Sequence, residues 1–480
     1  MRKLAALIAV LPVICLTCPV FADSGDMMAM LEGMKKQMVK MQETIDQQNL
    51  RIQQLESRKV LETPPPSSAI QPSAPPPSAL TDAVSWLKGA KFAGDLRLRM
   101  ENFDFFDKND DAGSTGAAND RSRNRFRFRL RWGFEKDFGD DWSLGFRLAS
   151  GNTTEPTSTN QTLGNSGYFN FKTVNIDRAY AAYEPSALKN QGLLKSVKIG
   201  AGKFENPFLR WSTPMMWDSD VTPEGVYEQA NIELVSADDT KVNVLTTLGQ
   251  FITNENAAVD TDAGLNGYQG VLTISTHAFG TKLPVDLNTA VSYYDYYNWS
   301  QTVINNTAST SYLRTNSILA DNFRVLDIYP ELVFYVDRTP LSLWADYAVN
   351  TANEGTDDAA RALGNDIHDS DDGWGLGFKF GKVKQRGTWE IFYGYYEIGV
   401  NAVPAAFNDA DFGGPGYNGF TNRKGHKFGL AYQLTDSLVF NWTAYLVRPL
   451  HPFNGNATLG IQNSSNESIF RSQADLVFKF

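Results

Sequence analysis

Hydrophobic and polar residues alternate strictly along residues 123–134, which read RNRFRFRLRWGF. Successive side chains of a strand point to opposite faces, so this period of two predicts a β-strand with a basic face and a large apolar face. The basic face carries Arg125, Arg127, Arg129 and Arg131, and the apolar face carries Phe126, Phe128, Leu130 and Trp132. Such a strand needs water on one side and an apolar environment on the other.

A soluble sheet would also satisfy this pattern if its apolar face covered a core and its arginines met solvent or nucleic acid. The formal net charge of −10 argues against a general nucleic-acid binder, because the summed field repels phosphate. The arginine stripe is therefore a local feature of an acidic protein. Whether the strand lies in a soluble sheet or in a membrane barrel has to be judged from the rest of the sequence.

From about Trp86 onward, alternating runs recur and predict about sixteen strands. Their centres are expected near residues 98, 129, 146, 179, 200, 231, 246, 272, 291, 331, 345, 377, 394, 429, 443 and 474. The gaps between these runs alternate in length. Short gaps of turn residues are DFGD (137–140), SADD (237–240), DRTP (337–340), KQRG (384–387) and TDS (435–437), and long ones include 107–120, 151–172 and 350–371.

A meander in which every second loop is short is typical of bacterial outer-membrane barrels, which have tight periplasmic turns and longer outside loops. The sequence therefore predicts an all-β fold, a transmembrane antiparallel barrel over residues 85–480. The final strand agrees with this, because Leu476, Phe478 and Phe480 share one face. A terminal phenylalanine in an alternating strand resembles the signal read by the barrel assembly machinery, which is an expected partner alongside membrane lipid.

The first 22 residues have the features of a signal peptide, with Arg2 and Lys3 before an apolar run and a cleavage site after Ala22. Both cysteines, Cys15 and Cys18, lie in this segment, so the mature chain is expected to have no disulfide and no thiolate metal site. A lipid anchor on Cys18 is an alternative, although Leu16-Thr17 fits a lipoprotein signal poorly. No later segment has the apolar length of a membrane helix, so a membrane-spanning chain has to be a closed barrel.

Residues 23–60 are expected to form a periplasmic coiled coil, because their apolar residues step by four and three. The seam is Met27, Leu31, Met34, Met38, Met41, Ile45, Gln48, Ile52 and Leu55. So narrow a stripe predicts self-association, whereas the alternative is a helix docked on its own domain. Residues 61–84 are rich in proline and serine and predict a semi-extended linker.

In a barrel with apolar residues facing lipid, the arginines face a wet lumen. The expected pore-lining set is Arg97, Arg99, Arg125, Arg127, Arg129, Arg131 and Arg147, on three consecutive strands. Like charges at this density need solvent, counter-anions or an acidic structure opposite them.

The expected acidic structure is the long loop at about 205–224, which holds Asp218, Asp220 and Glu224. It also contains apolar residues that suit a packed loop better than one in water, namely Trp211, Met215, Met216 and Trp217. The loop is predicted to fold into the barrel and create a transverse field that favours small polar solutes. The alternative is that it packs on a neighbouring subunit or caps the outside.

Six segments together support a resemblance to a known family. They are GDLRLR (94–99), RNRFRFRLRWGF (123–134), DDWSLGFRLASGN (140–152), DRAYAAYEP (177–185), GKFENPF (202–208) and WDSDVTPEG (217–225). With them, residues 90–480 resemble the putative porin family of Gram-negative outer membranes, in which a coiled coil precedes a sixteen-stranded barrel. The resemblance implies passage of small hydrophilic solutes or ions, and likeness to general porins implies a homotrimer with an infolded third outside loop.

Other functions remain as alternatives. An enzyme is disfavoured because the four histidines, His277, His368, His426 and His451, form no recognisable catalytic or metal pattern, and no cofactor is expected. A structural tether to peptidoglycan or a periplasmic partner through the coiled coil is compatible with a pore. The arginines suggest an anion-selective or phosphate-selective channel, and YYDYYNW (293–299) is either a sugar-binding track or part of the interfacial girdle.

Overall fold

The computed structural model describes residues 88–106, 122–153, 155–165, 167–237, 239–257, 261–278, 283–299, 323–352, 370–413, 421–451 and 468–480, together with Gln47. By compactness the chain divides into Met1–Thr81 and Asp82–Phe480. The predicted signal peptide, coiled coil and linker, and also His368, lie outside the described residues. No helix in the described part of the chain is long and apolar enough to cross a membrane.

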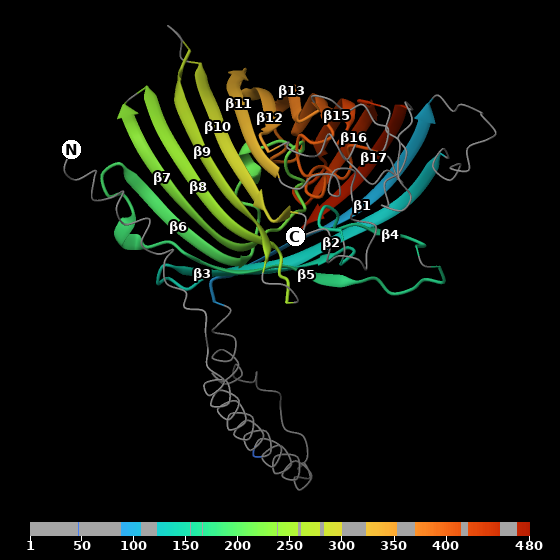
Figure 1. The fold of residues 1–480 in the computed structure, drawn as a ribbon, viewed down its shortest axis with the longest axis horizontal. Helices are drawn as coiled ribbons and strands as arrows, with labels where there is room; N and C mark the ends of the chain where they lie inside the picture. Colours follow the sequence, from blue (N-terminus) through green and yellow to red (C-terminus); the bar gives the residue numbers. More distant parts are fainter. Residues whose placement is uncertain are drawn as a thin grey trace, which may run out of the picture. The chain divides into compact units, whose positions relative to one another are not determined.

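The second unit is a closed antiparallel barrel (Figure 1). Its strands are β1 (Ala90–Phe106), β2 (Arg123–Asp137), β3 (Trp142–Ser150), β4 (Gln161–Thr162), β5 (Val174–Tyr183), β6 (Leu194–Lys203), β7 (Glu224–Ala237), β8 (Thr240–Asn254), β9 (Ala263–His277), β10 (Pro284–Tyr297), β11 (Phe323–Val336), β12 (Thr339–Asn350), β13 (Asp372–Gly381), β14 (Trp389–Ile398), β15 (Arg423–Gln433), β16 (Leu438–Pro449) and β17 (Ser468–Lys479). The long strands pair with the long strands next to them in sequence, so that β3 pairs with β5 past the two-residue β4, and β1 pairs with both β2 and β17, which closes the ring without a free edge.

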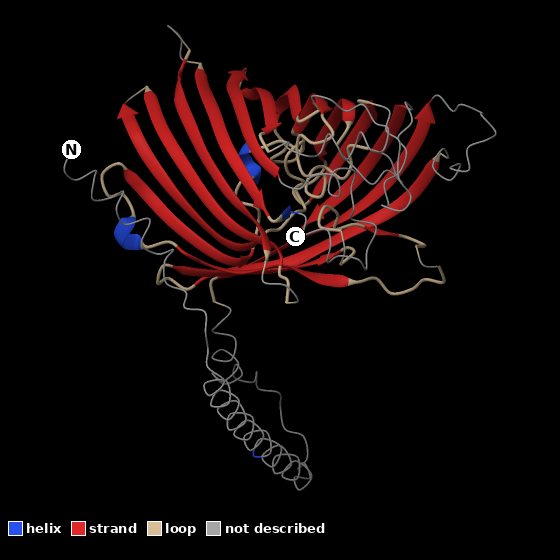
Figure 2. Cartoon of the chain, in the orientation of Figure 1, coloured by secondary structure: helices blue, strands red, loops and turns tan. Residues whose placement is uncertain are grey.

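The prediction of a sixteen-stranded barrel is confirmed. Each of the sixteen expected centres lies within one of the long strands, and the two-residue β4 is an additional short pairing with β2. The loops are also sorted as expected: tight turns join β7 to β8 and β11 to β12, whereas residues 204–223 and 399–422 form long loops at the other end. Helical structure in the described chain is limited to short segments such as Ser186–Leu188 and Leu209–Trp211 (Figure 2).

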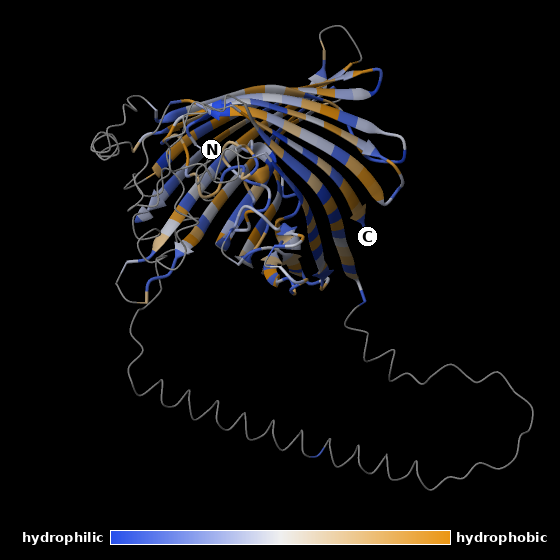
Figure 3. Ribbon diagram, turned by 90° about the vertical axis from the view of Figure 1, so that its right-hand side faces the viewer, coloured by the Kyte–Doolittle hydropathy of each residue, from blue (hydrophilic) through white to orange (hydrophobic). Residues whose placement is uncertain are grey.

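The two faces of β2 match the alternation in its sequence. Phe126, Leu130 and Trp132 are 58%, 39% and 43% exposed on the outer surface, whereas Arg127 and Arg129 are buried. Apolar and polar residues alternate along the other strands as well (Figure 3). In a barrel this alternation separates a lipid-facing outer surface from a polar interior.

Two long loops fold into the interior: the β6–β7 loop (residues 204–223) and the β14–β15 loop (residues 399–422, described to 413 and from 421). Their apolar side chains form one buried cluster with inward residues of β7 to β12, β14 and β16. Phe208 packs on the backbone of the barrel wall, because a Cβ on Gly267 would lie 2.6 Å from its ring. This cluster, which also contains Met215, Met216 and Trp217, fills one side of the lumen and fixes both loops there.

Candidate functional site

The arginine wall consists of the seven predicted arginines on β1, β2 and β3. Across the β1–β2 ladder Arg97 is paired in register with Arg129, and Arg99 with Arg127. Like charges directly opposite each other on one face destabilise a sheet unless neighbouring groups compensate them. The structure supplies this compensation with carboxylates from the same strands and from the infolded loops.

Carboxylates on the strands form the first layer of compensation. Asp95 accepts hydrogen bonds from Arg129 Nε at 2.9 Å and from Arg131 Nε at 2.7 Å. Asp475 on β17 holds Arg99 through two parallel hydrogen bonds of 2.8 and 2.9 Å, the bidentate geometry that favours arginine over lysine.

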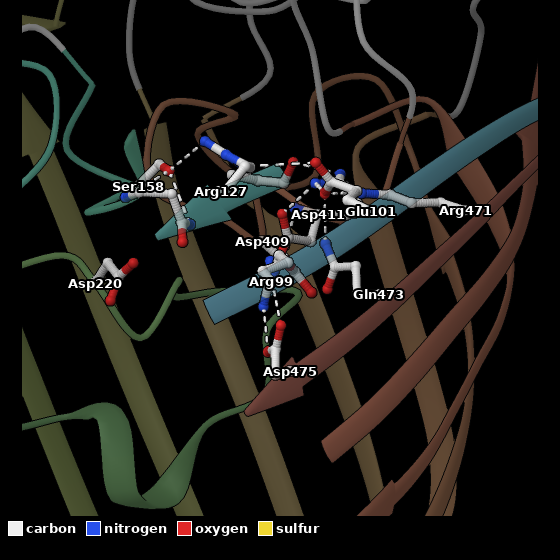
Figure 4. A network of polar contacts seen from close by, with 12 residues as sticks. Arg99, Glu101, Arg127, Ser158, Asp220, Asp409, Asp411, Arg471, Gln473 and Asp475 are labelled. Carbon is white, nitrogen blue, oxygen red and sulfur yellow. Dashed lines mark hydrogen bonds and ion pairs between the residues drawn. The ribbon is translucent and has the colours of Figure 1, made fainter. Parts of the chain in front are cut away.

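Glu101 is the most buried member of this layer, with no exposed surface. It accepts hydrogen bonds from Arg125, Arg471 and Gln473, and Arg127 Nη1 lies 3.8 Å from its Oε2 (Figure 4). One carboxylate therefore compensates several guanidinium groups, and this supports a dense basic wall at membrane depth.

The β14–β15 loop brings a second carboxylate layer to the wall. Asp411 Oδ2 lies 3.1 Å from Arg99 Nη1, and its Oδ1 accepts a hydrogen bond from Arg471 (Figure 4). Burial opposes ionisation of Asp411, but the charges of Arg471 and Arg99 outweigh it and hold its pKa well below the usual range. Asp409 in the same loop accepts a hydrogen bond from Lys427 Nζ at 2.8 Å.

In the β6–β7 loop, Asp220 faces the wall, with its Oδ1 3.8 Å from Arg129 Nη1 and 3.6 Å from Arg131 Nη1. Burial raises its pKa, but the charges of Arg129 and the other arginines outweigh this and lower it overall. Its other oxygen accepts hydrogen bonds from the backbone and hydroxyl of Thr159, at 3.1 and 3.0 Å. Thr159 lies in the loop between β3 and β5, so a third loop also contributes to this region.

The remaining predicted acids are placed differently. Asp218 accepts a hydrogen bond from the amide of Asp220 in its own loop and one from the amide of Ala410, which joins the two infolded loops. Burial, together with the nearby charges of Asp220 and Asp409, raises the pKa of Asp218 well above its usual range. Glu224 is apart from them, because it is the first residue of β7 and its exposed carboxylate pairs with Lys203 at 2.8 Å.

A cavity of about 380 Å³, called the chamber below, separates the loops from the wall. Its basic lining residues are Arg97, Arg99, Arg129 and Lys427, and its acidic lining residues are Asp218, Asp220, Asp409 and Asp411. A second cavity of about 560 Å³, called the vestibule below, shares Arg129 with the chamber. Its charged lining is Lys91, Arg129, Arg131, Arg147, Arg178 and Lys479 against Asp95 and Glu135.

The aromatic run at 293–299 divides between the two faces of β10 and the turn that follows. Tyr294, Tyr296 and Trp299 are fully buried and pack on the infolded loops, whereas Tyr293 and Tyr297 are partly exposed outside. Tyr294 makes edge-to-face contacts with Phe208 and Trp217 at centroid distances of 5.3 and 5.6 Å, and Tyr296 stacks on Phe407 at 6.1 Å. The inward members therefore anchor the loops rather than offering a free aromatic surface.

Sequence reasoning missed several charged residues of this site. Asp95 and Glu101 lie on the same face of β1 as Arg97 and Arg99, so the period of two in the first strand was a signal for them. Arg471 likewise shares a face of β17 with Asp475. Asp409 and Asp411 lie in a loop without a periodic pattern, and no comparable signal identifies them.

The described histidines, His277, His426 and His451, lie on different segments of the chain. His277 is at the end of β9 with Asp239 at 3.5 Å, and His426 on β15 contacts Tyr393 at 2.9 Å. Within the described residues, no group of three or more His, Cys, Asp or Glu side chains is placed to hold a metal ion.

A family model described as putative porin matches residues 77–317 and 300–446. A search of curated proteins found no match. Solved structures with a similar fold include Pseudomonas putida OprB at high pH, with 11% identity, 84% of this chain and 97% of that chain covered, and a TM-score of 0.44. A second is Salmonella typhi OmpF in complex with daunomycin, with 9% identity, 82% of this chain and 97% of that chain covered, and a TM-score of 0.40. A third is Pseudomonas aeruginosa OccK11, or OpdR, with 9% identity, 82% of this chain and 96% of that chain covered, and a TM-score of 0.37.

Proposed function

The chain belongs to the putative porin family, whose members are outer-membrane channels rather than enzymes, and from this premise we propose how its pore works. Small hydrophilic solutes and ions cross passively through a water-filled path between the arginine wall and the two infolded loops. The chamber is the constriction of this path. The observation that carries the proposal is the opposition of basic wall and acidic loops around one cavity.

The charges favour small anions over cations. The chamber has four basic and four acidic lining residues, and the raised pKa of Asp218 reduces its negative charge. The vestibule has six basic and two acidic residues, so it concentrates anions at the end of the path that carries the short turns. Within the chamber, opposed charges create a transverse field that orients dipolar solutes. Phosphate and other small anions belong to the favoured class.

The test is the reversal potential of the purified protein in a planar bilayer under a KCl gradient. We expect stepwise conductance with an anion preference that falls when Arg97 and Arg129 are both changed to Gln. Lys136→Gln is the matched control, because Lys136 lies on β2 but outside both cavities. Absence of conductance from a correctly folded barrel contradicts the pore, and an unchanged preference in the double variant contradicts the role of the wall.

The segments before the barrel complete the proposal. The mature chain starts at residue 23, residues 23–60 self-associate in the periplasm, and residues 61–84 act as a spacer. The heptad seam supports self-association of residues 23–60. Their periplasmic location is supported by Ala90, which pairs with Lys136 at the end of the barrel that carries the short turns. Deletion of residues 23–80 should preserve conductance, whereas loss of envelope integrity on deletion would reveal an additional tethering role.

A further inference from the structure

A third cavity inside the barrel, of about 270 Å³ and called the recess below, lies outside the chamber and is not needed for the passage of ions. It borders the inner face of β3, β5, β6 and β7, and residues 204–207 at the start of the β6–β7 loop close one side of it. Glu135 and Tyr180 line both the recess and the vestibule. A solute in the vestibule therefore has the recess directly beside it.

The recess exists because the inward side chains of this part of the wall are small. Ser143 and Gly145 share a face of β3 with Arg147, which lines the vestibule. In register across β5 and β6, Ser143 is paired with Ala182, and Ala182 with Gly200. These small residues leave space above the backbone that the infolded loops do not fill.

Aromatic rings form one side of the recess. A Cβ on Gly145 would overlap the ring of Tyr180, and a Cβ on Gly200 would overlap the ring of Tyr227, so both rings lie along the wall rather than across the lumen. Phe204 meets Tyr227 edge to face at a centroid distance of 4.7 Å. Rings in this orientation offer a broad apolar surface to a ligand in the cavity that they line.

Polar side chains form most of the remaining lining, namely Glu135, Ser143, Lys198, Glu205, Asn206 and Gln229. Asn206 is only 3% exposed, and its Oδ1 accepts a hydrogen bond from the amide of Phe208 at 3.0 Å. Among the described residues its Nδ2 has no hydrogen-bond partner. A buried donor without a partner is costly, so a ligand oxygen that accepts from Asn206 Nδ2 would be stabilised in the recess.

The charges of the recess balance each other. Glu205 accepts a hydrogen bond from Arg178 Nη1 at 2.9 Å, which leaves Glu135 and Lys198 as one charge of each sign. Glu135 accepts a hydrogen bond from the hydroxyl of Tyr180 at 3.1 Å and has capacity to accept more. The recess thus offers donors and acceptors without the excess of basic residues that concentrates anions in the vestibule.

We propose that the recess binds a neutral solute rich in hydroxyl groups, with a monosaccharide as the expected class. Hydroxyl groups both donate and accept, which matches the carboxylates and amides, and the C–H face of a sugar ring packs on aromatic side chains. The volume of about 270 Å³ equals that of roughly nine water molecules, which is room for one sugar ring. The inference rests on the proposed pore, because the solute reaches the recess through the same water-filled path.

The test is the binding of D-glucose to the full chain, purified in detergent and measured by saturation-transfer NMR. We expect saturable binding that is lost in Ser143→Leu, because the larger side chain fills the recess without a change of charge. Ser275→Leu is the matched control, because Ser275 shares the inward face of β9 with Val271 and lies outside the recess, the chamber and the vestibule. Absence of saturable binding to the unmodified protein would overturn the proposal, as would equal binding to both variants.

A second pair of variants tests the unpaired donor. Asn206→Asp keeps the oxygen that accepts from Phe208 but removes the donor, so it should raise the D-glucose concentration for half-saturation about fivefold, the effect of one lost hydrogen bond. Asn231→Asp adds the same charge on β7 outside the recess and should leave this concentration unchanged. Equal shifts in both variants would overturn the placement of the solute beside Asn206.

Two further measurements separate the possible failures. Choline is the cationic probe, because carboxylates beside aromatic rings also suit an ammonium group. Choline binding that is lost in Ser143→Leu, without binding of D-glucose, would overturn the assignment to a neutral solute. A protein that conducts KCl but does not bind D-glucose refutes this inference alone, whereas absence of conductance from a folded barrel refutes the pore.

Discussion

Removal of the charge of Asp411 is the most direct perturbation of selectivity. Asp411 lines the chamber, lies 3.1 Å from Arg99 and keeps its charge at neutral pH because its pKa is low. Asp411→Asn retains an oxygen that can accept a hydrogen bond, so the β14–β15 loop is expected to stay in place. The change removes one of four acidic residues from the chamber and leaves all four basic residues.

The magnitude follows from the size of the chamber. A volume of about 380 Å³ equals a sphere of roughly 4.5 Å radius, so an ion inside lies about 6 Å from a lining carboxylate and interacts with it by about 0.7 kcal/mol at a dielectric constant of about 80. Loss of this charge favours an anion and disfavours a cation by equal amounts. The anion-to-cation permeability ratio should therefore rise by about 1.4 kcal/mol, or about tenfold.

The assay is the reversal potential of single channels in a KCl gradient at low ionic strength, where screening is weakest. Asp436→Asn is the matched control, because Asp436 lies on the exposed turn between β15 and β16. It should leave the ratio unchanged. A ratio within about twofold of the unmodified protein, measured on Asp411→Asn channels of normal conductance, would refute the reasoning that the chamber is the constriction.

Three further predictions concern the structures that hold the chamber in place. Gly267→Ala adds a Cβ 2.6 Å from the Phe208 ring and should displace the β6–β7 loop, which would give larger and noisier single-channel currents. Gly270→Ala on the same strand is the control: its Cβ meets open space, so its currents should equal those of the unmodified protein. Glu101→Gln should lower the free energy of unfolding in urea by about 3–5 kcal/mol, because it leaves Arg125 and Arg471 without the anion that they share. The exposed-turn variant Asp436→Asn is the control, and an equally small decrease in the free energy of unfolding in both variants would contradict this prediction. Asp411 has a lowered pKa, so its charge is complete above the usual aspartate pKa and is lost only as the pH falls through the lower folded value. The difference in permeability ratio between the unmodified protein and Asp411→Asn should therefore stay constant from pH 7 to about 4 and shrink below that, and a difference that already shrinks near pH 5 would refute this reasoning.

The barrel was predictable because its signal is local and repeated. The alternation of arginine with Phe126, Phe128 and Leu130 assigns both faces of β2 without knowledge of its neighbours, and the turns at 137–140 and 337–340 place the strand ends. The first strand also contained a signal for which charges share its inner face, but not for their partners. Asp95 and Glu101 occupy the basic face of β1, but their partners are on β2 and β17, which only the closed ring brings alongside.

The site was harder to predict where it depends on loops. The apolar residues Met215, Met216 and Trp217 indicated a packed β6–β7 loop, and the structure places them in the buried cluster. The β14–β15 loop gave no such signal, because its position depends on the shape of the first loop. Asp218 N donates to Phe407 O at 2.7 Å and Asp409 N donates to Pro214 O at 2.9 Å, so the two loops fix each other.

These contacts connect the apolar side of the lumen to the charges of the chamber. Trp217 stacks on Phe407 at 5.8 Å, and Phe407 immediately precedes the segment that carries Asp409 and Asp411. The carboxylates opposite the arginine wall are thus held at their distances by aromatic packing, in which Trp217 lines the chamber and Phe407 lies behind it. A preorganised charge acts on a passing ion only while its position is fixed, since a mobile carboxylate would follow the nearest guanidinium group and cancel the field. The aromatic cluster therefore determines selectivity as much as the charges do, because it fixes the positions of the carboxylates in the chamber.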